Sequence, residues 1–204
     1  MIDAGIPTGL TFAALREANL ERYPLFVNAK GETEPSGVDW SPEDWMVAVF
    51  GELGEASNIL KKIRRDDFTV KEMQGRLARQ FSDAVIFLDL LSMQCGFETW
   101  KYDFATLRLY TRDNLPQGQN LNQLMVGAFY HAGTAASYLN FIRGNIRSEA
   151  QLVTSIRMVL YYIDRLADVC GINLDEAVKL TFNMKSRQLD LPLFLTDGGP
   201  IREK

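Results

Sequence analysis

Two long stretches with apolar residues at helical spacing limit most strongly what this sequence can fold into. In 42–65, alanine, valine, leucine and isoleucine recur three and four positions apart, as on the buried face of a helix. Ser41-Pro42-Glu43-Asp44 supplies an N-cap serine, a proline at the first helical position and two acids in the first turn. The stretch 72–95 has the same spacing and stops before Gly96, a residue type that commonly follows a helix. Sustained alternation of apolar and polar residues is absent from the sequence, so we predict an all-α fold.

Turn-forming residues divide the rest of the chain into shorter segments. Further helices are predicted over 10–23, 98–111, 121–143, 149–170 and 174–188. The segment 24–40 is predicted to be a loop, and the tail from Leu191 to be extended, because both are rich in proline and glycine. The 204 residues suit one domain, which we place over 1–204. A break near 114–120 separates a first part (10–113) from a second part (120–190).

Composition and charge exclude several classes of function. A net charge of -4 leaves no broad basic surface for a nucleic-acid backbone. No apolar run reaches the roughly 18 residues of a membrane-spanning helix, and the N-terminus lacks the basic segment of a secretory signal. Two cysteines do not make a disulfide framework, so we expect a cytoplasmic protein. With one histidine in the sequence, a metal site would have to be built from carboxylates.

The two long stretches have counterparts in the second part of the chain. The segment MVAVFGELGEASNILKKIRRD (46–66) aligns with MVGAFYHAGTAASYLNFIRGN (125–145), and 77–97 aligns with 152–172. Matched pairs include Gly54/Gly133, Asp89/Asp164, Cys95/Cys170 and Gly96/Gly171. We interpret this as an internal duplication whose two helix pairs pack together as one bundle. The alternative is chance similarity between amphipathic helices.

Polar residues of the first part are lost from its counterpart. The residues and their replacements are Glu52 (His131), Glu55 (Thr134), Gln80 (Ser155) and Asp83 (Met158). At 100° per residue, Glu52 falls within the apolar arc of its helix, and a core-facing carboxylate is costly unless it is paired, protonated or bound to a metal. Each helix carries an i,i+3 pair, and two facing pairs would form an oxygen-rich pocket suited to Mg²⁺ or Mn²⁺. Alternatively, these acids pair with nearby basic residues or lie at a solvated helix edge.

The segments GELGEASNILKKIRR (51–65) and FSDAVIFLDLL (81–91) resemble the MazG-like all-α nucleoside triphosphate pyrophosphohydrolases, which are related to dimeric dUTPases. The family pattern is E-x-x-E on one helix and E-x-x-D on the next. The resemblance covers 10–97 and also 171–192, which contains an F-N-x-x-S stretch. The segment that leads into the first long helix is similar to a family variant common in phage and bacterial genomes. It implies an enzyme that converts a nucleoside triphosphate to the monophosphate and pyrophosphate. The first part would be the catalytic repeat and the second a degenerate repeat.

The resemblance also implies roles for the matched residues. Glu52, Glu55 and Asp83 would be catalytic and would hold Mg²⁺ or Mn²⁺ against the triphosphate, with Gln80 as a fourth ligand. Gln80 departs from the family pattern, because its amide oxygen can bind a hard cation but brings no charge. We therefore keep a second hypothesis, a MazG-like helical module that binds a nucleotide or a partner without hydrolysis. A purely structural bundle is the third.

Further residues are expected to bind the substrate. The candidates for the phosphate oxygens are Lys61, Lys62, Arg64 and Arg65, for which a solvated helix face is the alternative. The candidates for the nucleoside are Trp45, Phe182, Asn183, Lys185 and Ser186. Trp45 and Phe182 would stack on the base, although core packing is the alternative for both, and the other three would donate hydrogen bonds. The resemblance also implies a guanine nucleotide (dGTP or GTP) as substrate and a homodimer, and we expect no nucleic-acid or membrane partner.

Overall fold

The computed structural model describes residues 9–25, 40–115, 118–139 and 146–203, except the side chains of 146 and 147. Its elements in chain order are α1 (Phe12–Arg22), the short 3-10 helix η1 (Tyr23–Leu25), α2 (Pro42–Arg64), α3 (Val70–Gln94), α4 (Phe104–Asn114), α5 (Leu121–Leu139), α6 (Ile146–Val169), α7 (Leu174–Gln188), β1 (Leu193–Thr196) and β2 (Gly199–Arg202). The predicted mostly helical class is confirmed. None of the helices in these ranges combines the length and the apolar character that crossing a bilayer requires.

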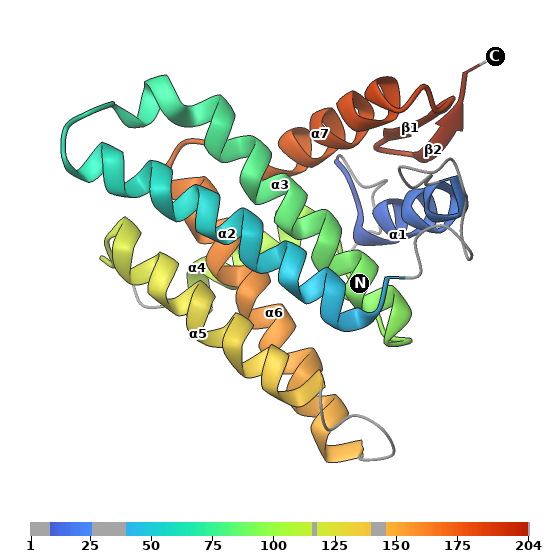
Figure 1. Ribbon diagram of the computed structural model, residues 1–204, viewed down its shortest axis with the longest axis horizontal. Coiled ribbons are helices and arrows are strands. Elements are labelled where there is room, and N and C mark those ends of the chain that lie inside the picture. The colour runs from blue at the N-terminus through green and yellow to red at the C-terminus, as the bar shows by residue number, and fades with distance from the viewer. Residues whose placement is uncertain (1–8, 26–39, 116–117, 140–145, 204) are drawn as a thin grey trace, which may run out of the picture.

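Two antiparallel helix pairs form the centre of the molecule (Figure 1). One pair is α2 with α3 and the other is α5 with α6, and contacts between α2 and α5 join them. Helix α4 packs against α6, and α7 packs against α3. Helix α1 contacts α3 on one side and the β1–β2 hairpin on the other, and β1 also contacts α7. The second half of the chain thus surrounds the α2–α3 pair on two sides.

Local sequence explains where the α2–α3 pair begins and ends. At the start of α2, the Ser41 hydroxyl accepts from the Asp44 N–H, and the Asp44 carboxylate accepts from the Ser41 N–H. Thr69 and Glu72 form the same reciprocal cap at the start of α3. After α3, Gly96 has a φ of 80°, which a glycine adopts without steric cost. Both caps fix the directions in which the two helices leave their loops.

The structure differs from the sequence prediction at two places. The helix expected over 98–111 begins later, at Phe104, because the Asp103 carboxylate caps it by accepting from the Thr106 N–H. The tail is extended as expected, but it also pairs with itself, and the antiparallel hairpin of β1 and β2 was not predicted. The loop prediction over 24–40 falls mostly on residues outside the described ranges.

Two aspartates at positions that the sequence alignment matches are buried, each with a side chain 1% exposed. Asp89 on α3 accepts hydrogen bonds from the Arg16 guanidinium of α1 and from the Asn19 amide. Asp164 on α6 has the Arg108 Nε at 3.6 Å, which is longer than an ordinary hydrogen bond. The core therefore holds one carboxylate with several short hydrogen bonds and one, Asp164, with a longer contact to its arginine.

Candidate active site

The four residues expected to form the metal site line one cavity of about 310 Å³ between α2 and α3. Its lining residues are Glu52 and Glu55 of α2 and Arg76, Arg79, Gln80 and Asp83 of α3. The cavity thus brings together three carboxylates, one carboxamide and two guanidinium groups. The two arginines were absent from the sequence prediction.

Helix geometry accounts for this arrangement. Residues three apart share a helix face, so Glu52 and Glu55 project together from α2, as Gln80 and Asp83 do from α3. The apolar arc predicted for α2 lies behind them: Val49, Leu53, Ala56, Ile59 and Leu60 are buried, and Ile63 is partly buried. Glu52 is partly buried at the boundary of this arc, and Glu55 is exposed at the mouth of the cavity. The arc anchors α2 and leaves the carboxylates directed toward α3.

Gln80 is tied to Glu55. Its amide nitrogen donates a hydrogen bond to Glu55 Oε2 at 2.6 Å, and its side chain is 9% exposed. A carboxylate accepts hydrogen bonds and cannot donate them when ionised, so the amide must turn its NH₂ group toward it. In this structure Gln80 therefore positions Glu55, whereas the sequence led us to expect its oxygen among the metal ligands.

Two carboxyl groups of the cavity, those of Glu52 and Asp83, have raised pKa values. Burial, the largest cause, and the negative charges of Asp83 and Glu55 together raise the pKa of Glu52 to about 7. Burial also raises the pKa of Asp83. Arg79 and Lys185 lower both pKa values, because their positive charges favour the ionised acids. Perturbed carboxyl groups that share a cavity are typical of functional sites.

Two cations from different helices face the acids. Arg79 Nε lies 3.7 Å from Asp83 Oδ2, one helical turn along α3. Lys185 comes from α7, and its positive charge lowers the pKa values of Glu52 and Asp83. The spacing contained a signal for the arginine, because Arg79 is four residues before Asp83 and therefore on the same face of α3. The spacing contained no signal that α7 would bring Lys185 to the acids, because that approach depends on tertiary packing.

Arg22, at the end of α1, is a buried cation that the sequence analysis missed. Its Nη1 donates to the Phe182 carbonyl at 3.1 Å, and its guanidinium lies 3.4 Å from the centre of the Phe182 ring. Burial lowers its pKa to about 9, and the negative charge of Asp83 opposes this shift. Arg22 thus links α1 and α7 and adds positive charge behind the acid cavity.

The donor set suits a hard divalent cation. Carboxylate and amide oxygens are the ligands that Mg²⁺ and Mn²⁺ prefer, and a cation would favour the ionised form of Glu52, whose pKa is raised by burial and by the neighbouring acids. Among the described residues, no three side chains of histidine, cysteine, aspartate or glutamate converge closely enough to share an ion. Cation binding would therefore require Glu52, Glu55 and Asp83 to turn inward across the cavity that they already line.

The basic residues near the end of α2 lie outside this cavity. The expected phosphate ligands there were Lys61, Lys62, Arg64 and Arg65. Arg65 pairs with Asp67 in the turn after α2. Arg64 lines another cavity, of about 590 Å³, formed with the start of α5. The alternative in which these residues neutralise the acids is not what the structure shows, because Arg79 and Lys185 do so instead.

Of the C-terminal candidates, Lys185 approaches the acids and three others have packing roles. The Phe182 side chain is 0% exposed and its ring is covered by Arg22, so it offers no face to a base. Asn183 holds the β1 strand, because its amide donates to the Leu195 carbonyl and accepts from the Leu195 N–H. Ser186 is buried as well.

Trp45 also belongs to the core. It is 3% exposed and lies in an aromatic cluster with ring centroids 4.5 Å from Trp40, 5.8 Å from Phe87 and 6.1 Å from Tyr23. The core-packing alternative therefore describes Trp45 in this structure.

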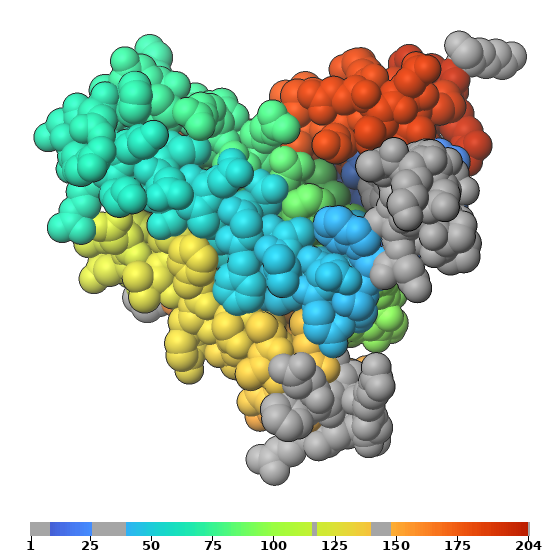
Figure 2. Space-filling model, in the orientation of Figure 1, coloured from blue at the N-terminus to red at the C-terminus, as the bar shows by residue number. Residues whose placement is uncertain are grey.

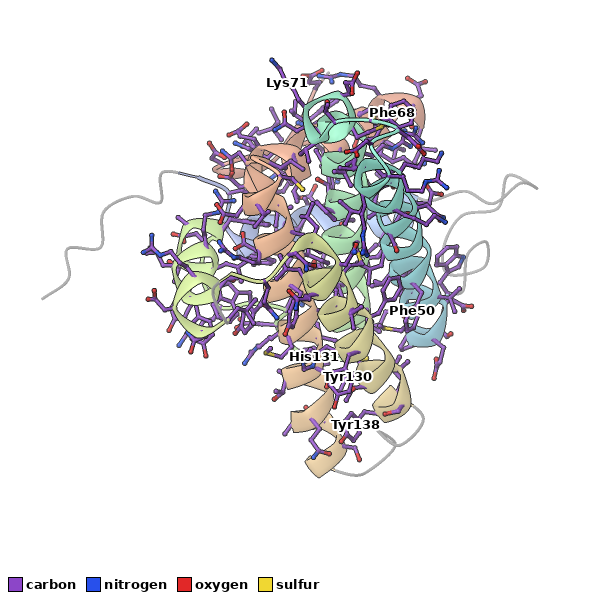
Figure 3. All side chains as sticks on the ribbon, turned by 90° about the vertical axis from the view of Figure 1, so that its left-hand side faces the viewer. Phe50, Phe68, Lys71, Tyr130, His131 and Tyr138 are labelled. Atoms are coloured by element: carbon purple, nitrogen blue, oxygen red, sulfur yellow. The ribbon has the colours of Figure 1, made fainter. Side chains whose placement is uncertain are left out.

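The residue that aligns with Glu52 has an aromatic environment. His131 lies on α5 beside Tyr130 (Figure 3). Its ring centroid is 5.6 Å from that of Tyr162, in a stacked arrangement, and 5.0 Å from that of Tyr130. Burial lowers its pKa, which favours the neutral imidazole. This is the packing environment of a structural residue.

Comparison with known proteins adds no assignment, since no protein-family model, no curated protein and no solved structure matches this chain. The resemblance to MazG-like enzymes therefore depends on the quoted segments and on the cavity that their residues line.

Proposed function

We propose that this protein is a metal-dependent nucleoside triphosphate pyrophosphohydrolase, which converts a (d)NTP to the monophosphate and pyrophosphate. The observation that carries the proposal is the shared cavity in which Glu52, Glu55 and Asp83 lie beside Arg76 and Arg79. Acids and cations that line one cavity suit a substrate that arrives with both phosphate oxygens and divalent cations. The sequence resemblance supports the same activity.

Five of the six side chains that line the cavity have a role in this proposal. Glu52, Glu55 and Asp83 would hold Mg²⁺ or Mn²⁺ through carboxylate oxygens. When bound, such a cation lowers the pKa of a water molecule and stabilises negative charge on the phosphate oxygens. Gln80 keeps Glu55 in place through its hydrogen bond. Arg79, whose contact with Asp83 is as long as 3.7 Å, can exchange it for a charge-assisted bond to a phosphate oxygen.

We also infer that the two helix pairs arose by duplication and that α5–α6 is the degenerate copy. Gly96 and Gly171 follow α3 and α6 with positive φ values of 80° and 67°. Asp89 and Asp164 are buried at matching positions, each facing an arginine from another helix. His131 occupies the place of Glu52 in an aromatic environment. In this account α2–α3 carries the chemistry and α5–α6 completes the bundle.

One observation favours the second hypothesis, a module that binds a nucleotide without hydrolysing it. Gln80 gives the site one negative charge fewer than four acids would, and its amide donates to Glu55. A site with less charge holds divalent cations less tightly. Turnover distinguishes the two hypotheses, because binding without product would identify the second.

The proposal is tested by measuring turnover of each common ribo- and deoxyribonucleoside triphosphate with Mg²⁺ or Mn²⁺. We expect hydrolysis of at least one of them, with dGTP or GTP as the first candidates. Glu55→Gln should abolish it, and Glu98→Gln, an exposed acid outside the cavity, should not. No turnover with either cation would overturn the enzymatic proposal.

A further inference from the structure

A second cavity, of about 450 Å³, lies between the first half of α3 and α7. In the space-filling view the outline of the molecule is hollowed between these two helices (Figure 2). The walls are mostly apolar and include Ala78 of α3, Ile172 before α7, and Leu180 and Met184 of α7. We call this cavity the α3–α7 groove. Its volume falls within the range of about 300–1,000 Å³ that is typical of small-molecule sites.

Two lining residues, Gly75 and Leu180, make the α3–α7 groove accessible to a ligand. Gly75 forms part of its wall, and a Cβ added there would meet nothing within 4 Å. A glycine within a helix costs about 1 kcal/mol relative to alanine. Gly75 therefore lowers the stability of α3 and leaves room in the groove where a side chain would lie. Leu180, at the edge of the groove, is 67% exposed. An apolar side chain so exposed beside an apolar hollow offers contact area to a ligand.

The groove adjoins the acid cavity through a shared residue. Arg79 lines both cavities, with Asp83 on one side and Ala78 on the other. Lys185 is the next residue after Met184 of the groove, and its positive charge lowers the pKa values of Glu52 and Asp83. From Gly75 to Asp83 the helix rises about 12 Å. A ligand along α3 would thus meet an apolar groove at one end and acids flanked by cations at the other.

We propose that the α3–α7 groove binds the nucleoside part of a nucleoside triphosphate whose phosphates lie at the acid cavity. The inference rests on the proposed function and adds the position of the base and sugar. A nucleotide has a flat, largely apolar base at one end and an anionic phosphate chain at the other. The groove would take the base, Arg79 would meet phosphate oxygens, and the acid cavity would hold the divalent cations that accompany them.

Other parts of the molecule fit the nucleoside less well. The cavity of about 590 Å³ beside Arg64 is larger, but it shares no lining residue with the acid cavity. The aromatic cluster around Trp45 could stack on a base only after repacking, because Trp45 is buried. The α3–α7 groove combines apolar walls with a connection to the acids through Arg79.

The test uses two neutral substitutions in the groove. Gly75→Leu fills the space that the glycine leaves, and its control is Gly133→Leu, which replaces another helical glycine with nothing within 4 Å of the added Cβ. Leu180→Gln removes apolar contact area, and its control is Val126→Gln, at an equally exposed position on α5. All four changes add no charge, and none removes a buried side chain, so folding should be retained and is checked by circular dichroism.

Calorimetry in the presence of Mg²⁺ then measures the binding of two probes by each variant. The first is a non-hydrolysable α,β-imido nucleoside triphosphate, and the second is inorganic triphosphate, which has no nucleoside. We expect Gly75→Leu and Leu180→Gln to weaken binding of the nucleotide analogue about tenfold or more, and to leave binding of inorganic triphosphate within about twofold. The two control variants should bind both probes as the wild type does.

The outcomes separate this inference from the proposed function. If the wild type binds the analogue and the two groove variants bind it equally well, the groove is not the nucleoside site, although the proposed function stands. If the variants weaken both probes alike, the effect acts on the acid cavity and the inference is wrong. If the wild type binds neither probe, the proposed function fails and the inference fails with it.

Discussion

Asp164 offers a prediction whose size can be worked from the structure. Its side chain is 1% exposed on α6, and burial raises its pKa from 3.8 to about 6, although Arg108 opposes the shift. The folded protein therefore holds this proton more tightly than the unfolded chain does. Between these two pKa values the folded state binds more protons, so the free energy of unfolding falls as the pH rises. Above about pH 6 the full penalty is present.

The magnitude follows from the shift of about two pKa units. At about 1.36 kcal/mol per unit, ionised Asp164 lowers the free energy of unfolding by about 3 kcal/mol at about pH 7.5, and by about 0.5 kcal/mol at about pH 4. Asparagine has the shape of the protonated acid and does not titrate. We therefore expect Asp164→Asn to be more stable than the wild type by about 3 kcal/mol at about pH 7.5, and nearly equal to it at about pH 4.

Urea unfolding followed by circular dichroism at the two pH values measures this difference. The matched control is Asp89→Asn, because Asp89 is equally buried but accepts hydrogen bonds from Arg16 and Asn19. Asp89→Asn should destabilise the protein by about 3 kcal/mol at about pH 7.5, since the substitution leaves the partly buried Arg16 without its anion. If Asp164→Asn destabilises the protein as Asp89→Asn does, or if its effect is independent of pH, the reasoning about Asp164 is refuted.

Three further predictions concern the site and its supports. Asn183→Ala should lower the free energy of unfolding by about 2 kcal/mol, because it removes two hydrogen bonds to the Leu195 backbone; chemical denaturation measures this, and no loss would contradict it. Thr69→Ala should cost about 1 kcal/mol by removing a helix cap, seen as a lower urea midpoint with an unchanged slope. Gln80→Glu should lower the melting temperature without metal, because it sets a carboxylate against Glu55, and should increase the rise on adding Mn²⁺. An equal rise in both proteins would argue against a metal site there.

The sequence was sufficient to predict most of the helices and the grouping of the acids. Apolar spacing and the Ser41-Pro42 start identified α2, and helical wheel positions placed Glu52 and Glu55 on the face that meets α3. These features are local, so a single helix contains the information. The C-terminal hairpin was not predicted, because its strands have only four residues each and β1 is held by Asn183 of α7.

The rest of the candidate site depends on contacts between distant segments. The resemblance implied that Lys185 binds the substrate, but no local spacing shows that α7 carries it to the acids. Nor does the F-N-x-x-S stretch show that Arg22 covers the Phe182 ring, which turned an expected base-stacking residue into a core residue. The direction of the Gln80 amide is likewise set by its neighbour, Glu55, and not by its own position on α3.

The most direct test of the central claim is identification of the products by ³¹P NMR. Wild-type protein is incubated with Mg²⁺ and the nucleotide that it turns over fastest, beside Asp83→Asn, which lacks one of the three acids of the cavity. The account predicts equal amounts of nucleoside monophosphate and pyrophosphate from the wild type, and neither from the variant. Nucleoside diphosphate with orthophosphate, or unchanged products from Asp83→Asn, would contradict it.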